Sequence, residues 1–275
     1  MRALGIDTSN YTTTAAVFDG SGGYNAGRLL EVRPGELGLR QSDALFQHIK
    51  HLPGRFAELR AEGWLTGLSA VGASARPRAV EGSYMPCFLV GEGQGRTLAD
   101  ALGVPFYPVS HQQGHIAAAA WSAGRLELLD RPMLAWHLSG GTTELLYVEP
   151  DGVNVRAQCV GGTSDISAGQ LIDRTGVLLG LPFPAGKALA EQGEPPAEIA
   201  RFTLETVASA VRRATDAARK RWPGLPVLCS GGVASNRLLR TVMSDAAFAG
   251  PQYSTDNAMG AAILAWRSLR QEAEA

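Results

Sequence analysis

The chain has 275 residues, of which 45% are hydrophobic and 19% are charged, and its formal net charge is −1. This length and apolar content fit one large folded domain or two smaller ones, and they exclude a disordered chain. The near-neutral charge excludes a global basic field that attracts nucleic acid, so contact with RNA would require a local patch or a partner protein.

The cysteines and the N-terminus narrow the class of protein further. Cys87, Cys159 and Cys229 are far apart and no CxxC pair exists. We therefore expect reduced thiols in a cytoplasmic protein and no cysteine zinc site. The N-terminus lacks the apolar run of a signal peptide, and no apolar stretch approaches the roughly 20 residues of a membrane helix. We expect no membrane segment.

In the first half of the chain, hydrophobic periodicity predicts a meander of three strands and then alternating helices and strands. We expect the helix over 43–59 to be interrupted by Pro53, because proline lacks the N–H of a helical hydrogen bond. The expected elements are strands 2–8, 11–19 and 24–33, helix 43–59, strand 68–75, a mostly helical segment 84–102, strand 105–109 and helix 112–122.

The second half repeats the same order. Its expected elements are strands 133–138, 143–148 and 153–160, helices 167–179 and 198–221, strand 227–230, helix 235–244, a short strand 252–254 and a closing helix 257–269. A meander plus helices, twice, resembles the actin-like ATPase (ASKHA) fold of actin, hexokinase and Hsp70, an α/β fold of two lobes, each with a mixed five-stranded sheet flanked by helices. We expect lobes at 1–125 and 126–256, with residues 257–275 packing back on the first.

The segment Ser110-His111-Gln-Gln-Gly-His115 follows a predicted strand and opens a predicted helix. Residues i and i+4 share a helix face, so both imidazoles can reach one cation. Two surface or capping histidines are the alternative. Near the other end of the chain, Thr255 or Asp256 is a candidate N-cap of the closing helix.

Two glycine turns are candidates for anion binding. In Ser139-Gly140-Gly141 the backbone N–H groups are unobstructed, although an ordinary hairpin turn has the same pattern. Residues 230–236 lead from a strand into a helix capped by Ser235 or Asn236, which suits a phosphate or equally a tight turn without ligand. Asp173 is a candidate for binding a ribose hydroxyl or for facing solvent. In contrast, the glycines of 91–96 indicate helix packing and not a dinucleotide loop.

Together these segments resemble the tRNA N6-threonylcarbamoyladenosine transferases, long labelled O-sialoglycoprotein endopeptidases. The matching stretches occur in family order over nearly the whole chain: 4–9, 111–115, 138–141, 168–169 with Asp173, 179–186, 231–236 and 255–258.

The resemblance implies a metal- and nucleotide-binding protein. His111, His115 and Asp256 resemble the family's ligands of one iron or zinc ion. The ligand it implies is ATP, ADP, AMP or threonylcarbamoyl-adenylate. Residues that resemble those facing this nucleotide are Ser139, Gly140, Gly141, Gly169, Asp173, Gly186, Gly231, Gly232 and Asn236.

The chain also departs from the family pattern. Tyr11 and Thr12 occupy the places of an acidic pair that contains a candidate catalytic carboxylate, so the catalytic residue is left unassigned. Thr142 replaces a histidine, Gln170 replaces a glutamate, and an insert after Ala190 is missing. These departures indicate a shortened, divergent paralogue in which the metal and nucleotide parts are kept.

Three hypotheses about function follow. The first is a threonylcarbamoyl or related carbamoyl transferase that acts on adenosine 37 of tRNA or another acceptor. The second is a nucleotide-binding regulatory or scaffold protein without turnover. A sugar or acetate kinase of the same fold is less consistent with the histidine pair, and a zincin peptidase would need a glutamate within HxxxH.

The resemblance also implies partner proteins of the threonylcarbamoyladenosine pathway, or a homodimer. The predicted helix 198–221 carries Arg201, Arg212, Arg213, Arg219, Lys220 and Arg221. This run is either a basic face for RNA or a solvated helix surface.

Overall fold

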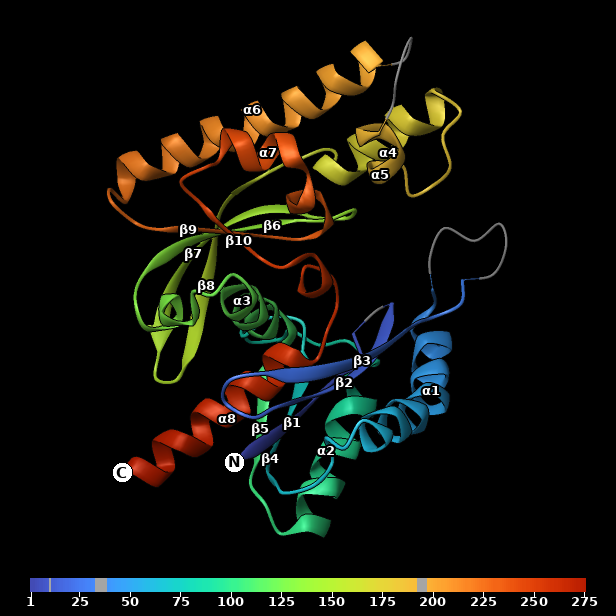
Figure 1. The fold of residues 1–275 in the computed structure, drawn as a ribbon, viewed down its shortest axis with the longest axis vertical. Helices are drawn as coiled ribbons and strands as arrows, with labels where there is room; N and C mark the ends of the chain where they lie inside the picture. The colour runs from blue at the N-terminus through green and yellow to red at the C-terminus, as the bar shows by residue number, and fades with distance from the viewer. Residues whose placement is uncertain (10, 33–38, 192–196) are drawn as a thin grey trace. The chain divides into compact units, whose positions relative to one another are not determined.

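The computed structural model describes residues 1–275 except 10, 33–38 and 192–196. Contacts within the chain divide it into two compact units. The first unit contains Met1–Ala118, Asp151–Arg156 and Asp256–Ala275. The second contains Ala119–Pro150 and Ala157–Thr255. Each unit is built around one five-stranded sheet (Figure 1).

The sheet of the first unit has the strand order β3-β2-β1-β4-β5. Its antiparallel part consists of the meander β1, β2 and β3, and β4 and β5 continue the sheet parallel to β1. The strands span Arg2–Asp7 (β1), Thr12–Phe18 (β2), Gly23–Leu29 (β3), Leu68–Arg76 (β4) and Phe106–Ser110 (β5). The three parallel strands therefore end at one edge of the sheet.

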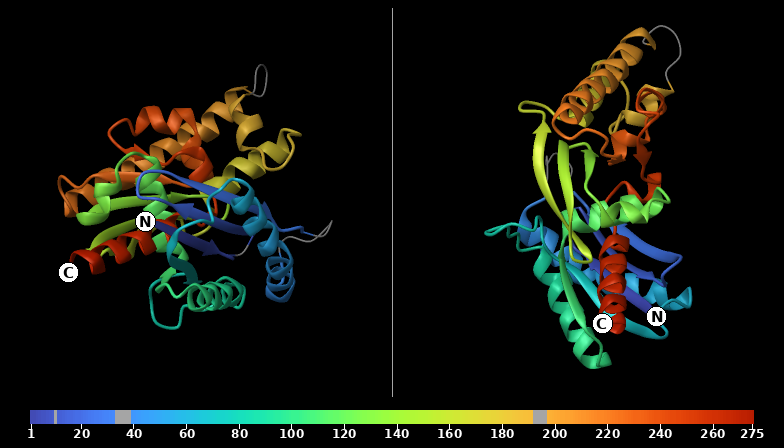
Figure 2. Two further views of the ribbon diagram at one scale, coloured as in Figure 1. Left: turned by 60° about the horizontal axis from the view of Figure 1, so that its bottom comes forward. Right: turned by 90° about the vertical axis from the view of Figure 1, so that its left-hand side faces the viewer.

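Helices cover both faces of this sheet (Figures 1 and 2). Successive residues of a strand point to opposite faces. Leu4 and Ile6 accordingly pack with α1 (Gln41–Ala61) and α2 (Phe88–Leu102), whereas Ala3 packs with α8 (Met259–Glu274). On the α8 face the strands carry glycine because the helix lies very close. A Cβ on Gly5 would lie 2.3 Å from the carbonyl oxygen of Ala258.

Two helices on this face also meet at glycines. A Cβ on Gly260 of α8 would lie only 1.8 Å from the carbonyl oxygen of Gly114 in α3 (His111–Ser122). The reverse substitution is less crowded, because a Cβ on Gly114 finds its nearest neighbour, the Ala261 nitrogen, at 3.7 Å. The backbones of α3 and α8 are thus in direct contact at Gly260.

The second sheet has the order β10-β9-β6-β7-β8. Written in reverse, this order is that of the first sheet, with β8, β7, β6, β9 and β10 in the places of β3, β2, β1, β4 and β5. Strand β6 pairs antiparallel with β7, β9 is parallel to β6, and β10 is parallel to β9. The strands span Met133–Leu138 (β6), Thr143–Asp151 (β7), Asn154–Gly162 (β8), Val227–Ser230 (β9) and Ala247–Phe248 (β10). The predicted duplication, and with it the actin-like α/β class, is confirmed.

The core of the second unit forms where the long helix α6 packs on its sheet. Leu134, Trp136 and Leu138 of β6 are buried against Ala208 and Val211 of α6. The helical segments of this unit are η1 (Leu126–Asp130), α4 (Ala168–Leu178), α5 (Gly186–Ala190), α6 (Ala197–Arg221), η2 (Gly232–Ser235), α7 (Arg237–Val242) and η3 (Pro251–Tyr253).

Two expectations about local structure are wrong. Pro53 lies inside α1 and does not interrupt it. Buried Leu52 and Leu59 anchor the helix on the sheet on both sides of the proline, and this packing outweighs the lost hydrogen bond. Residues 252–254 form no strand, because Pro251 opens a 3₁₀ turn in which Tyr253 N–H donates to Gly250 O at 2.9 Å. The edge strand of the second sheet is instead β10, at Ala247–Phe248.

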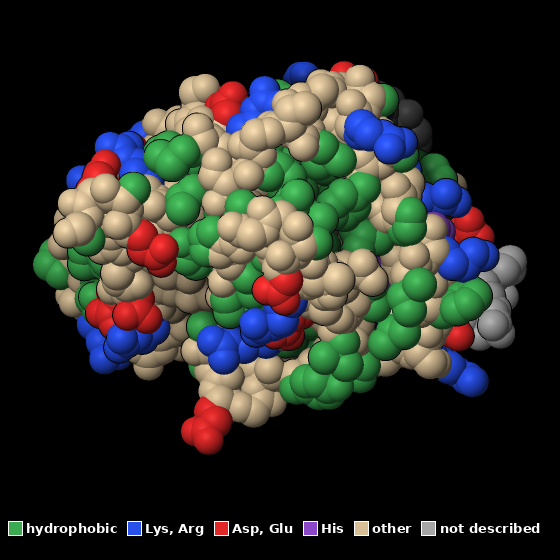
Figure 3. All heavy atoms as spheres, turned by 90° about the horizontal axis from the view of Figure 1, so that it is seen from below, with side chains coloured by type: hydrophobic (Ala, Val, Ile, Leu, Met, Phe, Trp, Pro, Cys, Tyr) green, Lys and Arg blue, Asp and Glu red, His purple; other side chains and the backbone are tan. Residues whose placement is uncertain are grey.

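Within the described part of the chain, no helix is both long and apolar enough to cross a bilayer. On the face shown in Figure 3, basic and acidic side chains are both present among hydrophobic ones. This mixture agrees with the formal net charge of −1.

Candidate functional site

Three neighbouring parallel strands of the first unit have a polar site residue at or close to their carboxyl ends. Asp7 is the last residue of β1, Ser74 lies near the end of β4, and His111 follows β5 directly. The register places Ile6 beside Ala73 and Ser74 beside Val109, so these residues lie at the same edge. The carboxyl ends of parallel strands are where α/β proteins generally bind ligands.

The helix that carries both histidines begins with a reciprocal cap. Gln113 N–H donates to the Ser110 hydroxyl at 3.2 Å, and Ser110 N–H donates to Gln113 Oε1 at 2.9 Å. This capping box fixes the first turn of α3. His111 and His115 lie one turn apart, and their ring centroids are 4.3 Å apart. The shared helix face predicted from the i, i+4 spacing is present.

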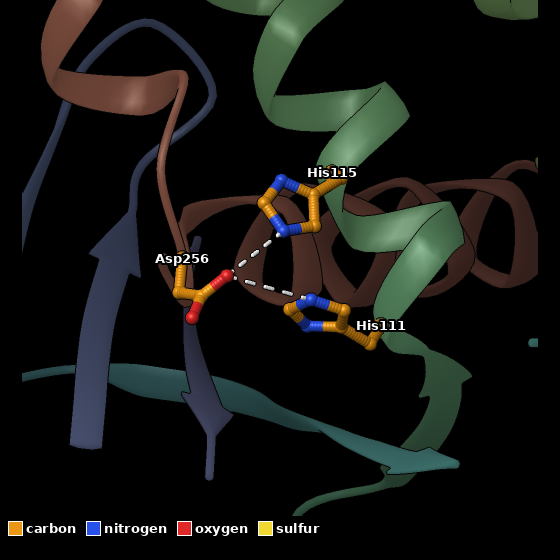
Figure 4. Close-up of side chains that lie close together, drawn as sticks. All are labelled: His111, His115 and Asp256. Atoms are coloured by element: carbon orange, nitrogen blue, oxygen red, sulfur yellow. Dashed lines mark hydrogen bonds and ion pairs between the residues drawn. The ribbon is translucent and has the colours of Figure 1, made fainter. Parts of the chain in front are cut away.

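Asp256 lies just before α8 and points at both rings (Figure 4). Its Oδ1 is 3.3 Å from His115 Nε2 and 3.6 Å from His111 Nε2. The expectation that Thr255 or Asp256 caps the closing helix is wrong, because Asn257 Oδ1 accepts the Met259 N–H at 3.1 Å. Asp256 is thereby left to face the histidines.

The spacing of these three groups fits one divalent cation. Their ligand atoms all lie within 4.8 Å of one another. Zinc–nitrogen and zinc–oxygen bonds of about 2.1 Å in tetrahedral geometry separate the ligand atoms by roughly 3.4 Å, close to the 3.3 and 3.6 Å found here. Two imidazoles and one carboxylate suit zinc or iron and leave coordination positions open for a ligand.

Asp7 is a site residue that the sequence analysis did not identify. It is 1% exposed, and its Oδ2 lies 2.8 Å from His111 Nδ1. The Ser74 hydroxyl donates to the same oxygen, and Ser9 N–H donates to Oδ1 at 2.9 Å. The available signal was an acidic residue at the end of a buried strand, which is costly there unless it is paired.

The charges of this cluster depend on one another. Burial acts to raise the pKa of Asp7, but the charge and hydrogen bond of His111, with those of Ser74 and Ser9, hold it well below its usual range. Burial alone would lower the pKa of His111, yet Asp7 and, more weakly, Asp256 raise it to about 9. Burial also acts to raise the pKa of Asp256, and His115 and His111 overcome that effect.

A further buried histidine lies in the same unit, on α1. His48 is fully buried, and its Nδ1 is 2.8 Å from the Thr13 hydroxyl of β2. Burial lowers the pKa of His48 to about 4, so this imidazole is neutral near pH 7. It does not belong to the three-ligand cluster.

In the second unit, the turn between β6 and β7 has free space above its glycines. Ser139 fixes the turn, because its N–H donates to Thr142 O at 2.8 Å and its hydroxyl accepts Thr142 N–H at 3.0 Å. A Cβ on Gly140 or Gly141 would meet no atom within 4 Å. The same holds for Gly232, after β9. These backbones are open to an approaching group.

Two other glycines that were expected to face a nucleotide are needed for packing. A Cβ on Gly169 would lie 2.4 Å from Gly140 Cα, so this glycine lets α4 approach the β6–β7 turn. Gly231 has φ +95°, and a Cβ there would lie 2.1 Å from the Leu138 carbonyl oxygen. Both positions require glycine whether or not a ligand is present.

The remaining candidates also make contacts within the unit. Asp173 Oδ1 accepts the Ala185 N–H at 2.8 Å and so holds the residue before Gly186. The Cβ position of Gly186 is nearly open, with Ile172 at 3.9 Å. Of the two predicted caps, Asn236 is the one used, since its Oδ1 accepts the N–H groups of Leu238 and Leu239.

The basic residues of α6 are partly neutralised. Arg201 pairs with Glu205 at 2.7 Å, and Arg212 contacts Asp216 at 3.1 Å. Arg212 also lies 3.0 Å from Asp245, which pairs with Arg219 as well. These pairs favour the interpretation of α6 as a solvated helix surface over that of a free basic face.

Comparison with known proteins matches the sequence of this chain to one family. The family model described as tRNA N6-adenosine threonylcarbamoyltransferase matches residues 47–263. A relative of that name from Granulibacter bethesdensis is 30% identical over an alignment covering 98% of this chain and 88% of the relative. Another from Rhodospirillum rubrum is 32% identical, over 70% of this chain and 54% of the relative.

The fold is also found in solved structures. A ROK family glucokinase from Streptomyces griseus, in complex with glucose and AMPPNP, superposes with a TM-score of 0.60. The match covers 97% of this chain and 100% of the glucokinase at 15% sequence identity. At that identity the likeness establishes the fold alone.

Proposed function

Since the chain belongs to the tRNA N6-adenosine threonylcarbamoyltransferase family, we propose that it transfers a threonylcarbamoyl or related carbamoyl group from an adenylate to an amine acceptor. The proposed acceptor is the N6 amine of adenosine in tRNA, and the proposed products are the modified adenosine and AMP. Family membership supports the reaction type. The proposed roles in metal and adenylate binding rest on the residues of this chain.

One observation carries the proposal, namely the meeting of His111, His115 and Asp256 from distant parts of the sequence. We propose that these residues hold one zinc or iron ion. Such an ion, when bound, supplies a Lewis acid for a carbonyl oxygen of the carbamoyl group. Asp256 contributes the negative charge that compensates the cation, and the two neutral imidazoles fix its position on the rigid helix α3.

We propose that the open turns of the second unit bind the adenylate. A Cβ at Gly140, Gly141 or Gly232 would meet no atom within 4 Å, so these turns leave room for phosphate oxygens to approach the main chain. Ser139 and Asn236 hold these turns in shape, and Asp173 supports the segment before Gly186. In this proposal Gly169 and Gly231 act only by allowing close packing.

The test is metal content combined with transfer. Protein purified without chelators should contain about one zinc or iron ion per chain, and the His111→Ala variant should contain none. Transfer of labelled threonylcarbamoyl from its adenylate to tRNA should require the metal-loaded protein. Wild-type protein that holds neither zinc nor iron when either is supplied would refute the metal part of the proposal.

A second candidate function rests on a different observation. Tyr11 and Thr12 stand where the family resemblance leads one to expect acidic residues. A protein that binds the nucleotide without turnover, as a regulator or scaffold, would need no carboxylate there. Nucleotide binding with normal affinity, together with no transfer to tRNA by the metal-loaded protein and its partners, would favour this alternative.

We also propose that the chain acts with other proteins. The ion pairs of Arg201, Arg212 and Arg219 leave less free positive charge on α6 for RNA. A partner that supplies basic surface, either another protein of the threonylcarbamoyladenosine pathway or a second copy, would compensate. Gel-shift assays with tRNA, alone and with candidate partners, test this proposal.

A further inference from the structure

We propose that Asp7 is a positioning residue that sets the orientation and proton arrangement of His111 for metal binding. The inference rests on the proposed metal site and extends it by one residue. It concerns a carboxylate that touches neither the ion nor the substrate directly. Its evidence is the geometry at the ends of β1, β4 and β5.

Asp7 is held in one orientation by donors on all sides. Ser9 N–H donates to Oδ1 at 2.9 Å, and the Ser74 hydroxyl donates to Oδ2. The carboxylate is 1% exposed, so no water competes for these bonds from bulk solvent. The Thr14 hydroxyl donates to the main-chain oxygen of Asp7 at 3.1 Å, so this bond does not set the direction of the carboxylate. This fixed carboxylate then lies 2.8 Å from His111 Nδ1.

That contact decides which nitrogen of His111 faces the cation. A carboxylate accepts a proton and cannot donate one, so a neutral His111 carries its proton on Nδ1 and donates it to Asp7. The lone pair is then on Nε2, the atom that lies 3.6 Å from Asp256 Oδ1. Metal-bound histidines commonly donate their second N–H to a carboxylate in this way, which fixes the ring and raises its basicity.

Charge balance points to the same role. With both imidazoles acting as neutral metal ligands, the carboxylates of Asp7 and Asp256 carry a charge of −2 that a divalent cation neutralises. Without Asp7, only the half-buried Asp256 of these two carboxylates would compensate the cation. The donors on Asp7 occupy its oxygens and hold the carboxylate beside the metal site without making it a ligand.

The test compares three variants of the full chain by metal affinity and by spectrum. Asp7→Asn preserves size but exchanges one oxygen for an NH₂ group, which must face either Ser9 N–H or the Ser74 and His111 donors. Ser74→Ala removes one donor from the carboxylate and leaves the charge. Thr14→Val is the matched control, because it removes a buried hydrogen bond to the main chain of Asp7 and leaves the carboxylate untouched.

Zn²⁺ affinity is measured by competition with a chromophoric chelator, and Co²⁺ is used to record the ligand-field spectrum. Asp7→Asn should weaken Zn²⁺ binding by about 10–100-fold and change the Co²⁺ spectrum. Ser74→Ala should show a smaller loss, and Thr14→Val should match the wild type in both measurements. Altered ligand-field bands would not arise from a loss of stability alone.

Several results would overturn the inference. One is equal Zn²⁺ affinity and an unchanged Co²⁺ spectrum in Asp7→Asn, and another is an equal loss in Thr14→Val. If Asp7→Asn fails to fold, the comparison of Ser74→Ala with Thr14→Val decides, and equal affinities refute the inference. Wild-type protein that binds neither ion would instead refute the proposed metal site, so the two failures are distinguishable.

Discussion

The contact between Gly260 and Gly114 allows a sharp test of what holds the histidine helix beside Asp256. We predict that Gly260→Ala damages both stability and metal binding. The new Cβ would lie 1.8 Å from Gly114 O and 2.6 Å from Gly114 Cα, whereas real Cβ atoms keep at least 3.0 Å from such neighbours. Both clashing atoms belong to the backbone of α3, so no side-chain rotation relieves the overlap.

The magnitude follows from opposing effects. Separating the helices by about 1 Å costs roughly 3 kcal/mol, at the upper end of ordinary overpacking. Alanine regains about 1 kcal/mol relative to glycine inside a helix. The net loss of about 2 kcal/mol corresponds to a melting temperature lower by roughly 4–8 °C for a protein of this size. The same displacement moves His111 and His115 away from Asp256, so Zn²⁺ affinity should fall as well.

Gly114→Ala is the matched control on the same contact. Its Cβ would meet only ordinary neighbours, the nearest at 3.7 Å, so the variant should be as stable as the wild type or slightly more stable. Thermal unfolding of the metal-free proteins measures the stability effect, and chelator competition measures the metal effect. Equal melting temperatures for Gly260→Ala and Gly114→Ala would refute the close helix contact described above.

Three further predictions concern single residues. His111→Ala should lose Zn²⁺ binding while its far-UV circular dichroism stays that of the wild type, because His111 directly follows β5 and its side chain is 21% exposed; loss of the helical signal would contradict this. The buried His48 has a folded-state pKa of about 4 against 6.5 for the free group, so the stability that its neutral form provides is present above pH 6.5 and is lost as the pH falls toward 4. This loss is about 3 kcal/mol, and urea unfolding at several pH values should show a shallower acid dependence in His48→Gln. Asn236→Ala removes the cap of α7 and should cost about 1 kcal/mol in urea unfolding, whereas Asn236→Asp should keep most of it.

The sequence was sufficient for the repeated architecture because that depends on local patterns. Alternating apolar residues and turn glycines mark the two meanders, and β6 and β9 have the expected bounds, 133–138 and 227–230. The sequence pattern was insufficient where tertiary contacts determine the local structure. Pro53 stays in a helix because the surrounding leucines are buried, and residues 252–254 turn instead of extending because of Pro251 and Gly250.

For the candidate site, spacing alone predicted that His111 and His115 share a face, and the resemblance to a family added Asp256. Asp7 was missed because its role depends on neighbours 67 and 104 residues away in the chain, Ser74 and His111. The family resemblance placed Gly169 and Gly231 at a nucleotide, and that assignment stays a prediction. The contacts of the folded chain add that both positions need glycine for close packing, which local sequence does not reveal.

The placement of Asp7, Ser74 and His111 at the ends of adjacent strands bears on how this protein can diverge. Strand ends are fixed by the main-chain ladder of the sheet, so the groups that orient the histidine are insulated from change in the connecting loops. Substitutions of exposed residues in the loop after β4, such as Val80 and Tyr84, would therefore leave the inner geometry in place. The relative positions of these three side chains thus depend on the pairing of β1, β4 and β5 and not on the length or sequence of the loops.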